Sequence, residues 1–278
     1  MKHIFITIAL SLVTPTASAQ APAGLPKTFP ELAAILPEWS RAHPQPADFG
    51  PYGEAVTAAL ARDPDSAAAA MPALSRDLQD PDQEVKSSTL AVLQVLAMRP
   101  DGPDLLAPLS SQIADAIATG DQSTQVLALM TAAYLRAKAP DVVIGPIENL
   151  LRTRRASDKA IIVAAEALIA IRPTDEAAQK RVISVINDPS TPLAVRYQVL
   201  YGTADFGTGS LVIDNVVQIA NTSEDKKLRD TAISAALRIG PLAAARIQDR
   251  AGRIYNDPRE SQASHQLAER ALGLQSVH

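Results

Sequence analysis

The sequence of 278 residues contains no cysteine and only four histidines. Without cysteine the chain can form no disulfide, no thiolate zinc site and no iron–sulfur cluster, and it has no thiol nucleophile. The histidines are scattered and lie mostly towards the ends of the chain: His3, His43, His265 and His278. Because such spacing does not build a histidine metal centre, we expect no metal and no cofactor.

Positive charge and aromatic residues are also scarce. The chain has 26 Lys and Arg against 30 Asp and Glu, a net charge of −4, and 4 % aromatic residues. Proteins that bind nucleic acid carry a basic stripe that neutralises phosphates, so no nucleic-acid partner is expected. The short motifs of zinc proteases, serine hydrolases and P-loop proteins are absent as well. We therefore expect a protein that is not an enzyme.

The first 19 residues have the features of a signal peptide. Lys2 supplies the positive charge, residues 4–13 form an apolar run, and Ala17-Ser18-Ala19 is a small-residue cleavage signal before Gln20. Ten apolar residues are too few to cross a bilayer, and no later apolar stretch is long enough. We expect a Sec-type signal, a bacterial periplasmic or secreted location, and a mature chain without a membrane span or lipid anchor. A buried N-terminal helix is the alternative.

Residues 20–52 form a proline-rich segment. Seven of the 21 prolines lie here, and such density favours turns and extended backbone. A short helix fits residues 29–42, and Trp39 lies within it. The segment is either a cap on the end of a repeat array or an arm that binds a partner through Trp39. We expect a repeat domain in residues 53–278.

From residue 53 onward, breaks recur at regular intervals. Helices are predicted to begin near residues 65, 103, 141, 174, 208 and 241, steps of about 33 to 38 residues that indicate an array of helix pairs. A second break within each pair carries Asp or Ser residues suited to N-capping, in the segments Asp80-Pro81-Asp82, Gly120-Asp121, Ser157-Asp158, Asp188-Pro189-Ser190, Ser223-Glu224-Asp225 and Asp257-Pro258. Apolar residues recur at spacings of three and four, without alternation of period two. The sequence predicts an all-α fold of about six helix pairs.

The segment Asp80-Pro81-Asp82-Gln83-Glu84-Val85-Lys86 resembles the turn and second helix of a HEAT or armadillo-type repeat. Related patterns occur at residues 188–196 and 228–233. The resemblance implies a right-handed α-solenoid in which turn carboxylates and helix cations form a ladder between repeats. It assigns that structural role to Asp80, Lys86, Asp188, Arg196 and Arg229. Tetratricopeptide repeats have a similar period, but their fixed Trp, Gly and Tyr positions are missing.

Glu166 is the single charge within the aliphatic segment of residues 160–171. This segment is predicted to be a second helix, and the second helices of a solenoid line its concave face. A carboxylate in such a helix lies on the exposed face or is buried and paired. Glu166 is therefore either an exposed residue without a role or a contact for a basic partner.

Three tyrosines are also predicted to lie on second helices. Tyr197 and Tyr201 are four residues apart and share a helix face, and Tyr134 lies on an earlier helix. They either form an aromatic patch that binds a peptide or glycan, or they pack between repeats.

Two further segments have charged or anion-binding features. The cations Arg152, Arg154, Arg155 and Lys159 could hold an acidic partner or a lipid headgroup, or could be a solvated turn. The glycines of residues 207–210 could present backbone amides to an anion, or could form a tight turn.

We predict a non-catalytic scaffold that binds a protein partner of the cell envelope along its concave face. The predicted partner-binding residues are Glu166, Tyr197, Tyr201, Tyr134 and Trp39. One alternative is an enzyme or enzyme accessory acting on a cell-envelope polymer, with Glu166 and Asp or Tyr residues of the concave face as acid–base groups. That chemistry needs a second carboxylate about 5 to 10 Å away. Another alternative is a small-ligand carrier, which needs an enclosed pocket.

Overall fold

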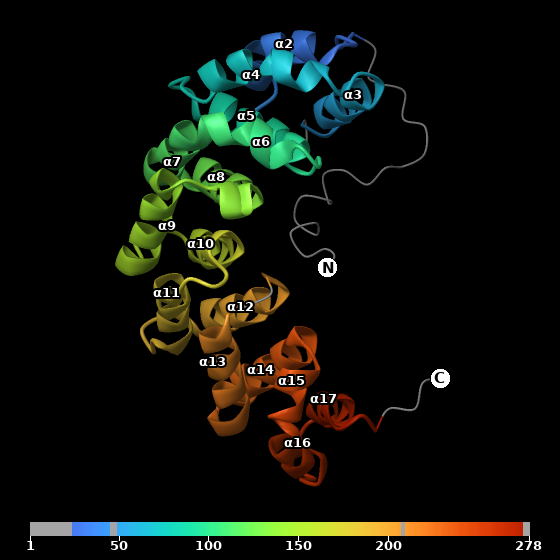
Figure 1. The fold of residues 1–278 in the computed structure, drawn as a ribbon, viewed down its shortest axis with the longest axis vertical. Coiled ribbons are helices and arrows are strands. Elements are labelled where there is room, and N and C mark those ends of the chain that lie inside the picture. Colours follow the sequence, from blue (N-terminus) through green and yellow to red (C-terminus); the bar gives the residue numbers. More distant parts are fainter. Residues whose placement is uncertain (1–23, 45–48, 207–208, 275–278) are drawn as a thin grey trace. The chain divides into compact units, whose positions relative to one another are not determined.

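The computed structural model describes residues 24–44, 49–206 and 209–274 (Figure 1). These residues form α-helices joined by turns and short 3-10 segments, and they contain no strand. The predicted all-α fold is therefore confirmed. The predicted signal peptide, residues 1–19, lies outside the described residues.

The chain divides between Leu150 and Leu151, near the end of α9, into two compact units. In the first unit, α5 packs between α2 and α8, while α4 contacts α5 and α7 contacts α8. The helices of this unit and of the boundary are α2 (Phe29–Ala42), α3 (Phe49–Arg62), α4 (Ser66–Asp77), α5 (Gln83–Ala97), α6 (Gly102–Leu106), α7 (Ser110–Thr119), α8 (Gln122–Leu135) and α9 (Asp141–Thr153).

The second unit repeats this arrangement. Helices α10, α12, α14 and α17 contact one another in that order, and α11, α13 and α16 each pack against the helix that follows them. The bounds are α10 (Asp158–Ile171), α11 (Glu176–Asn187), α12 (Leu193–Thr203), α13 (Ser210–Thr222), α14 (Lys226–Ile239), α15 (Pro241–Ala245), α16 (Gln248–Tyr255) and α17 (Gln262–Leu272). Each pair thus buries its apolar face against the neighbouring pair, as in repeat proteins.

The helices begin close to the residues that the prolines and capping residues predict. Observed starts of the first helices are residues 66, 102, 141, 176, 210 and 241. The side chains of Asp82, Asp121, Ser157 and Asp225 accept hydrogen bonds from backbone amides of the following helix, as predicted. Local capping chemistry therefore sets these boundaries.

Two predicted caps are wrong. Asp188 accepts the Ser190 backbone amide at 2.8 Å, and Asp257 accepts the Arg259 amide at 3.0 Å. Each side chain closes a turn before its helix instead of capping it. The extra turn residues move the start of α12 to Leu193, after Pro192, and that of α17 to Gln262, after the capping Ser261.

The helix predicted over residues 29–42 is confirmed as α2, which packs against α3, α4 and α5. Trp39 is partly buried, with its ring centroid 4.6 Å from that of Tyr52 and 4.7 Å from that of His43. Tyr52 is fully buried and donates a hydrogen bond to the Leu32 carbonyl at 2.6 Å. Helix α3 continues through residue 52, and the division between arm and repeats at that residue stays a prediction.

Candidate partner-binding surface

Helices α10, α12 and α14 of the second unit, which pack side by side, carry a set of partly or fully exposed side chains. We call this set the second-helix surface. It is formed by the partly or fully exposed side chains of Ile162, Glu166, Ala170, Tyr197, Tyr201, Lys227, Thr231, Ser234 and Arg238. On α10 these positions are four residues apart, so they form one stripe along a helix that is otherwise buried from residue 160 onward. The surface contains three of the five predicted binding residues.

Glu166 lies in this stripe, against α12. Its carboxyl group occupies the space beside Gly202, where a Cβ would be 2.8 Å from Glu166 Cδ. Burial raises the pKa of Glu166 to about 7, from an ordinary value of 4.5. The side chain makes no hydrogen bond or ion pair with any described residue. Glu166 is therefore largely desolvated and has no polar partner in the described part of the chain, an arrangement that the sequence did not predict.

Tyr197 and Tyr201 do share a face of α12, and each ring holds a cation from α14. The ammonium of Lys227 lies 4.3 Å from the centroid of the Tyr197 ring, and the guanidinium of Arg238 lies 4.0 Å from that of Tyr201. Arg238 also pairs with Asp205. These cation–π contacts fix the rings beside α14, yet Tyr201 remains 40 % exposed. The pair thus packs between repeats and still presents aromatic surface.

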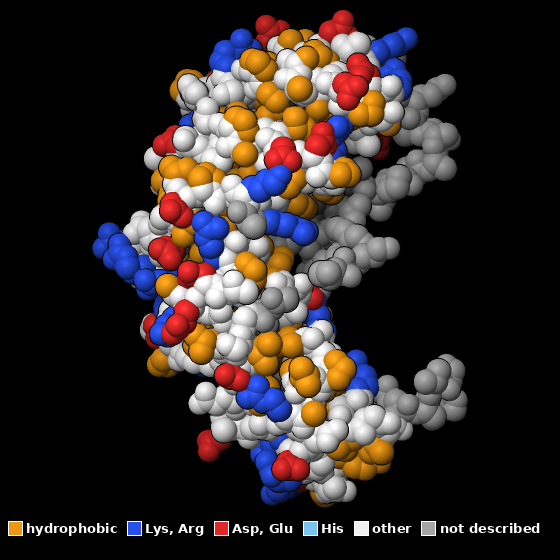
Figure 2. Space-filling model, viewed as in Figure 1, with side chains coloured by type: hydrophobic (Ala, Val, Ile, Leu, Met, Phe, Trp, Pro, Cys, Tyr) orange, Lys and Arg blue, Asp and Glu red, His pale blue; other side chains and the backbone are white. Residues whose placement is uncertain are grey.

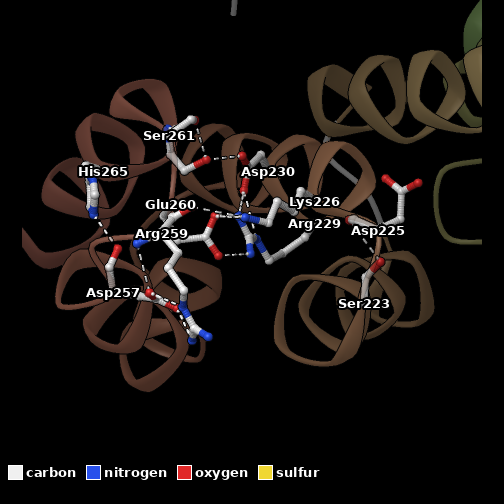
Figure 3. A network of polar contacts seen from close by, with 11 residues as sticks. Ser223, Asp225, Lys226, Arg229, Asp230, Asp257, Arg259, Glu260, Ser261 and His265 are labelled. Carbon is white, nitrogen blue, oxygen red and sulfur yellow. Dashed lines mark hydrogen bonds and ion pairs between the residues drawn. The ribbon is translucent and has the colours of Figure 1, made fainter.

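At the α14–α17 end, the surface is bordered by a network of ion pairs (Figure 3). The guanidinium of Arg229, whose side chain is 3 % exposed, donates to both carboxylate oxygens of Glu260 at 2.8 and 3.0 Å. It also donates to Asp230 at 2.7 Å, and Lys226 lies 3.2 Å from Glu260. Hydrogen bonding from Arg229 lowers the pKa of Glu260 to about 2. The network joins α14 to the turn before α17.

The ladder of cross-repeat pairs is present in part. Arg229 pairs with Glu260, and Asp80 accepts from Arg41 of α2 at 2.7 Å. Arg196 instead donates to the Ile186 carbonyl at 2.6 Å. Lys86 forms no ion pair within the described part of the chain. The pairing role that the resemblance assigns to these two residues is therefore not observed.

One member of the predicted basic cluster, Arg154, forms contacts within the fold. It pairs with Asp188 and donates to the Thr191 hydroxyl at 2.6 Å and to the Ser184 carbonyl at 3.2 Å. Its backbone has φ +52°, in the left-handed region that non-glycine residues seldom adopt. Arg154 supplies the ladder contact that was expected from Arg196.

The predicted anion site lies partly outside the described residues, since 207 and 208 are not described. At Gly209 a Cβ would be 2.5 Å from Gln179 Cδ. The Gln179 side-chain oxygen accepts the Leu211 amide at 3.0 Å and the Val212 amide at 3.4 Å. Gln179 therefore satisfies first-turn amides of α13 that an anion would otherwise contact.

The other two predicted binding residues lie in the first unit. Tyr134 is partly buried on α8, and burial raises its pKa. Trp39 packs in the aromatic cluster of α2 and α3. Neither belongs to the second-helix surface.

Positive and negative side chains are interspersed over each unit in the view of Figure 2. Within the described ranges, no helix has the length and apolar character needed to cross a bilayer. The same residues contain no group of three or more His, Asp or Glu side chains placed to hold a metal ion.

Comparison with known proteins identifies the fold. No protein-family model matches the chain, and no curated protein does. The chain resembles a HEAT-like repeat protein from the archaeon Thermococcus onnurineus NA1, with a TM-score of 0.52, 12 % identity, and coverage of 90 % of this chain and 97 % of that one. It is also similar to a designed armadillo repeat protein, with 15 % identity, a TM-score of 0.46, and coverage of 73 % and 98 %. The predicted HEAT-like repeat fold is confirmed.

Proposed function

We propose that the protein is a non-catalytic scaffold that binds a protein partner through the second-helix surface. The observation that carries the proposal is the composition of this surface. It combines an exposed aromatic ring at Tyr201 with oriented cations and the unpaired carboxyl group of Glu166. Aromatic and charged anchors of this kind supply most of the free energy of protein–protein binding. HEAT-like folds commonly present such surfaces, which supports the proposal without specifying the partner.

Tyr134 and Trp39 stay proposed contacts of the first unit. Because Trp39 packs against Tyr52, its role as a cap on the array is the one that its contacts favour. Substitution of Tyr134 tests a partner contact better than substitution of Trp39 does. Helix α8 keeps its aliphatic core when Tyr134 is replaced, whereas replacing Trp39 removes its packing against Tyr52.

A second candidate, acid–base catalysis on a cell-envelope polymer, draws support from Glu166 alone. A carboxyl group with a pKa near 7 suits a general acid. Glycoside hydrolysis requires a second carboxylate nearby. Burial is the one cause of the raised pKa of Glu166, so no neighbouring carboxylate contributes to it. Turnover of purified peptidoglycan that is lost in Glu166→Gln, with the fold intact, would establish this candidate over the scaffold.

Export to the periplasm or medium is proposed from the first 19 residues. N-terminal sequencing of the protein recovered from a periplasmic fraction tests it. A mature chain that begins at Gln20 supports export, and a chain that retains Met1 in the cytoplasm contradicts it.

The scaffold proposal is tested by crosslinking the protein in its native cells and identifying captured proteins by mass spectrometry. We expect one partner in stoichiometric yield, and loss of that partner in a Tyr197→Ala/Tyr201→Ala variant. The matched control is Tyr255→Ala, which removes an exposed tyrosine of α16 outside the second-helix surface. Equal capture by both variants would place the interface elsewhere.

A further inference from the structure

An open groove of about 530 Å³ lies between α14 and the start of α17, at one end of the second-helix surface. Its lining residues are Tyr201, Lys226, Lys227, Asp230, Thr231, Ser234, Ser261 and Ser264. The groove has one aromatic wall, and most of its exposed lining is apolar, while the hydroxyl and charged groups of the other lining residues make up the smaller share. Its preference for a ligand therefore depends on which of these groups still lack a partner.

The carboxylates of the groove are already satisfied. Asp230 accepts from Arg229 at 2.7 Å with one oxygen and from the Ser264 hydroxyl at 2.6 Å with the other. Both oxygens of Glu260, behind the groove, accept from Arg229, and one also pairs with Lys226. Figure 3 shows these groups turned towards one another in the network. A cationic ligand would have to displace internal hydrogen bonds to reach either carboxylate.

Several donors remain unused. The ammonium of Lys227 lies over the Tyr197 ring and forms no ion pair with any described residue. Lys226 has three N–H donors, of which two serve Glu260 and the Arg259 carbonyl. The Ser234 hydroxyl makes no hydrogen bond to a described group. The groove therefore offers hydrogen-bond donors without matching acceptors.

The ion pairs around the groove also leave a donor available for an anionic ligand. Arg229 and Lys226 are balanced by Asp230 and Glu260, and Arg238 is balanced by Asp205. Among the cations of the groove, Lys227 is the one that forms no ion pair with a described residue. The Tyr197 ring already holds its ammonium in place, which reduces the entropy lost when it binds an anion.

We propose that this groove binds an acidic segment of the partner protein, with an Asp or Glu side chain of that segment accepted by Lys227. Lys226 and Ser234 supply further donors to the carboxylate, and an apolar side chain beside it contacts the exposed edge of Tyr201. A peptide suits the groove because one short segment can carry a carboxylate side chain for Lys227 and a neighbouring apolar side chain for Tyr201. The inference rests on the proposed scaffold function and names the chemistry of its ligand.

Fluorescence anisotropy with three short labelled peptides tests this inference on the full mature chain. The probes alternate Tyr with Glu, with Gln or with Lys. We expect the Glu peptide to bind most tightly, with an affinity that falls as salt is added. Lys227→Gln should weaken its binding about tenfold, the size of one lost charge-assisted hydrogen bond.

The matched control is Lys180→Gln, which removes an exposed lysine of α11, outside the groove, and the same single charge. It should change affinity by less than about twofold. Circular dichroism establishes that both variants are folded. Equal binding of the Glu and Gln peptides, or equal loss in both variants, overturns the inference. A further competition shows whether inorganic phosphate displaces the Glu peptide at equal concentration, and such displacement would assign the groove to free anions instead.

Failure of this inference is distinguishable from failure of the scaffold proposal. If Lys227→Gln captures the native partner as well as the wild type does, while Tyr197→Ala/Tyr201→Ala does not, the scaffold stands and the acidic-segment inference is wrong.

Discussion

The carboxyl group of Glu166 on α10 lies in the space that a Cβ at position 202 of α12 would occupy. Such a Cβ would be 2.8 Å from Glu166 Cδ and 3.0 Å from Cγ, closer than nonbonded carbons pack. Glycine at 202 therefore permits the close approach that desolvates Glu166. The two residues, on adjacent second helices, form one packing unit within the second-helix surface.

Gly202→Ala should destabilise the protein by about 1 to 2 kcal/mol, because the added methyl group overpacks the contact between α10 and α12. In a Glu166→Ala background the same substitution should instead stabilise by about 0.5 to 1 kcal/mol, since alanine favours a helix over glycine. Urea unfolding followed by circular dichroism measures both effects. The same sign in both backgrounds would show that Glu166 does not fill this space.

The raised pKa of Glu166 should make stability fall between pH 4.5 and about 7. In this range the unfolded state loses its proton before the folded state does, so deprotonation favours unfolding. Glu166→Gln should remove this slope and stabilise the protein by up to about 3 kcal/mol above pH 7. Urea midpoints at a series of pH values measure it. A wild-type slope that persists in the variant would contradict the assignment to Glu166.

Arg229→Ala should destabilise the second unit by about 3 to 5 kcal/mol, because it leaves Asp230 and Glu260 without their shared partner. The control Arg253→Ala, at an exposed position of α16, should change stability by less than about 0.5 kcal/mol. Thermal unfolding of both variants compares them. Equal melting temperatures would show that the network adds no stability.

Gln179→Ala should destabilise the protein by about 1 to 2 kcal/mol, since it removes the acceptor for two amides at the start of α13. Gln179→Glu keeps an acceptor and adds negative charge near a helix N-terminus, so it should retain most of the stability. The free energy of unfolding in urea distinguishes the two variants. Equal losses would show that the capping oxygen is not what matters at position 179.

Helix positions could be predicted because their signals are local. Asp121 and Ser157 cap the helices that follow them, and each signal lies within a few residues of its effect. Asp188 and Asp257 carry the same residue type, but their side chains close a turn instead. The difference depends on the number of residues in the turn, which the period of the repeat does not specify.

The chemistry of the surface was predicted only in part. Glu166 could be found because a lone carboxylate in an aliphatic helix is unusual. Its contact with Gly202 could not, since the two residues are 36 positions apart in the sequence and meet only when α10 packs on α12. For the same reason Arg154 looked like part of a solvated turn, although its partners lie on α11 and in the turn that follows.

The groove that we assign to an acidic segment exists only while the last helix is docked. Ser264 of α17 and Glu260 before it attach this end of the chain to α14 through Asp230 and Arg229. Among the described helices, α17 packs mainly on α14 and α16, and elements with few packing neighbours open at lower free energy than the interior of an array. A bound segment would select the docked state. Amide hydrogen exchange in α16 and α17 should therefore slow in proportion to ligand occupancy. The exchange rates of these two helices then measure binding in the groove.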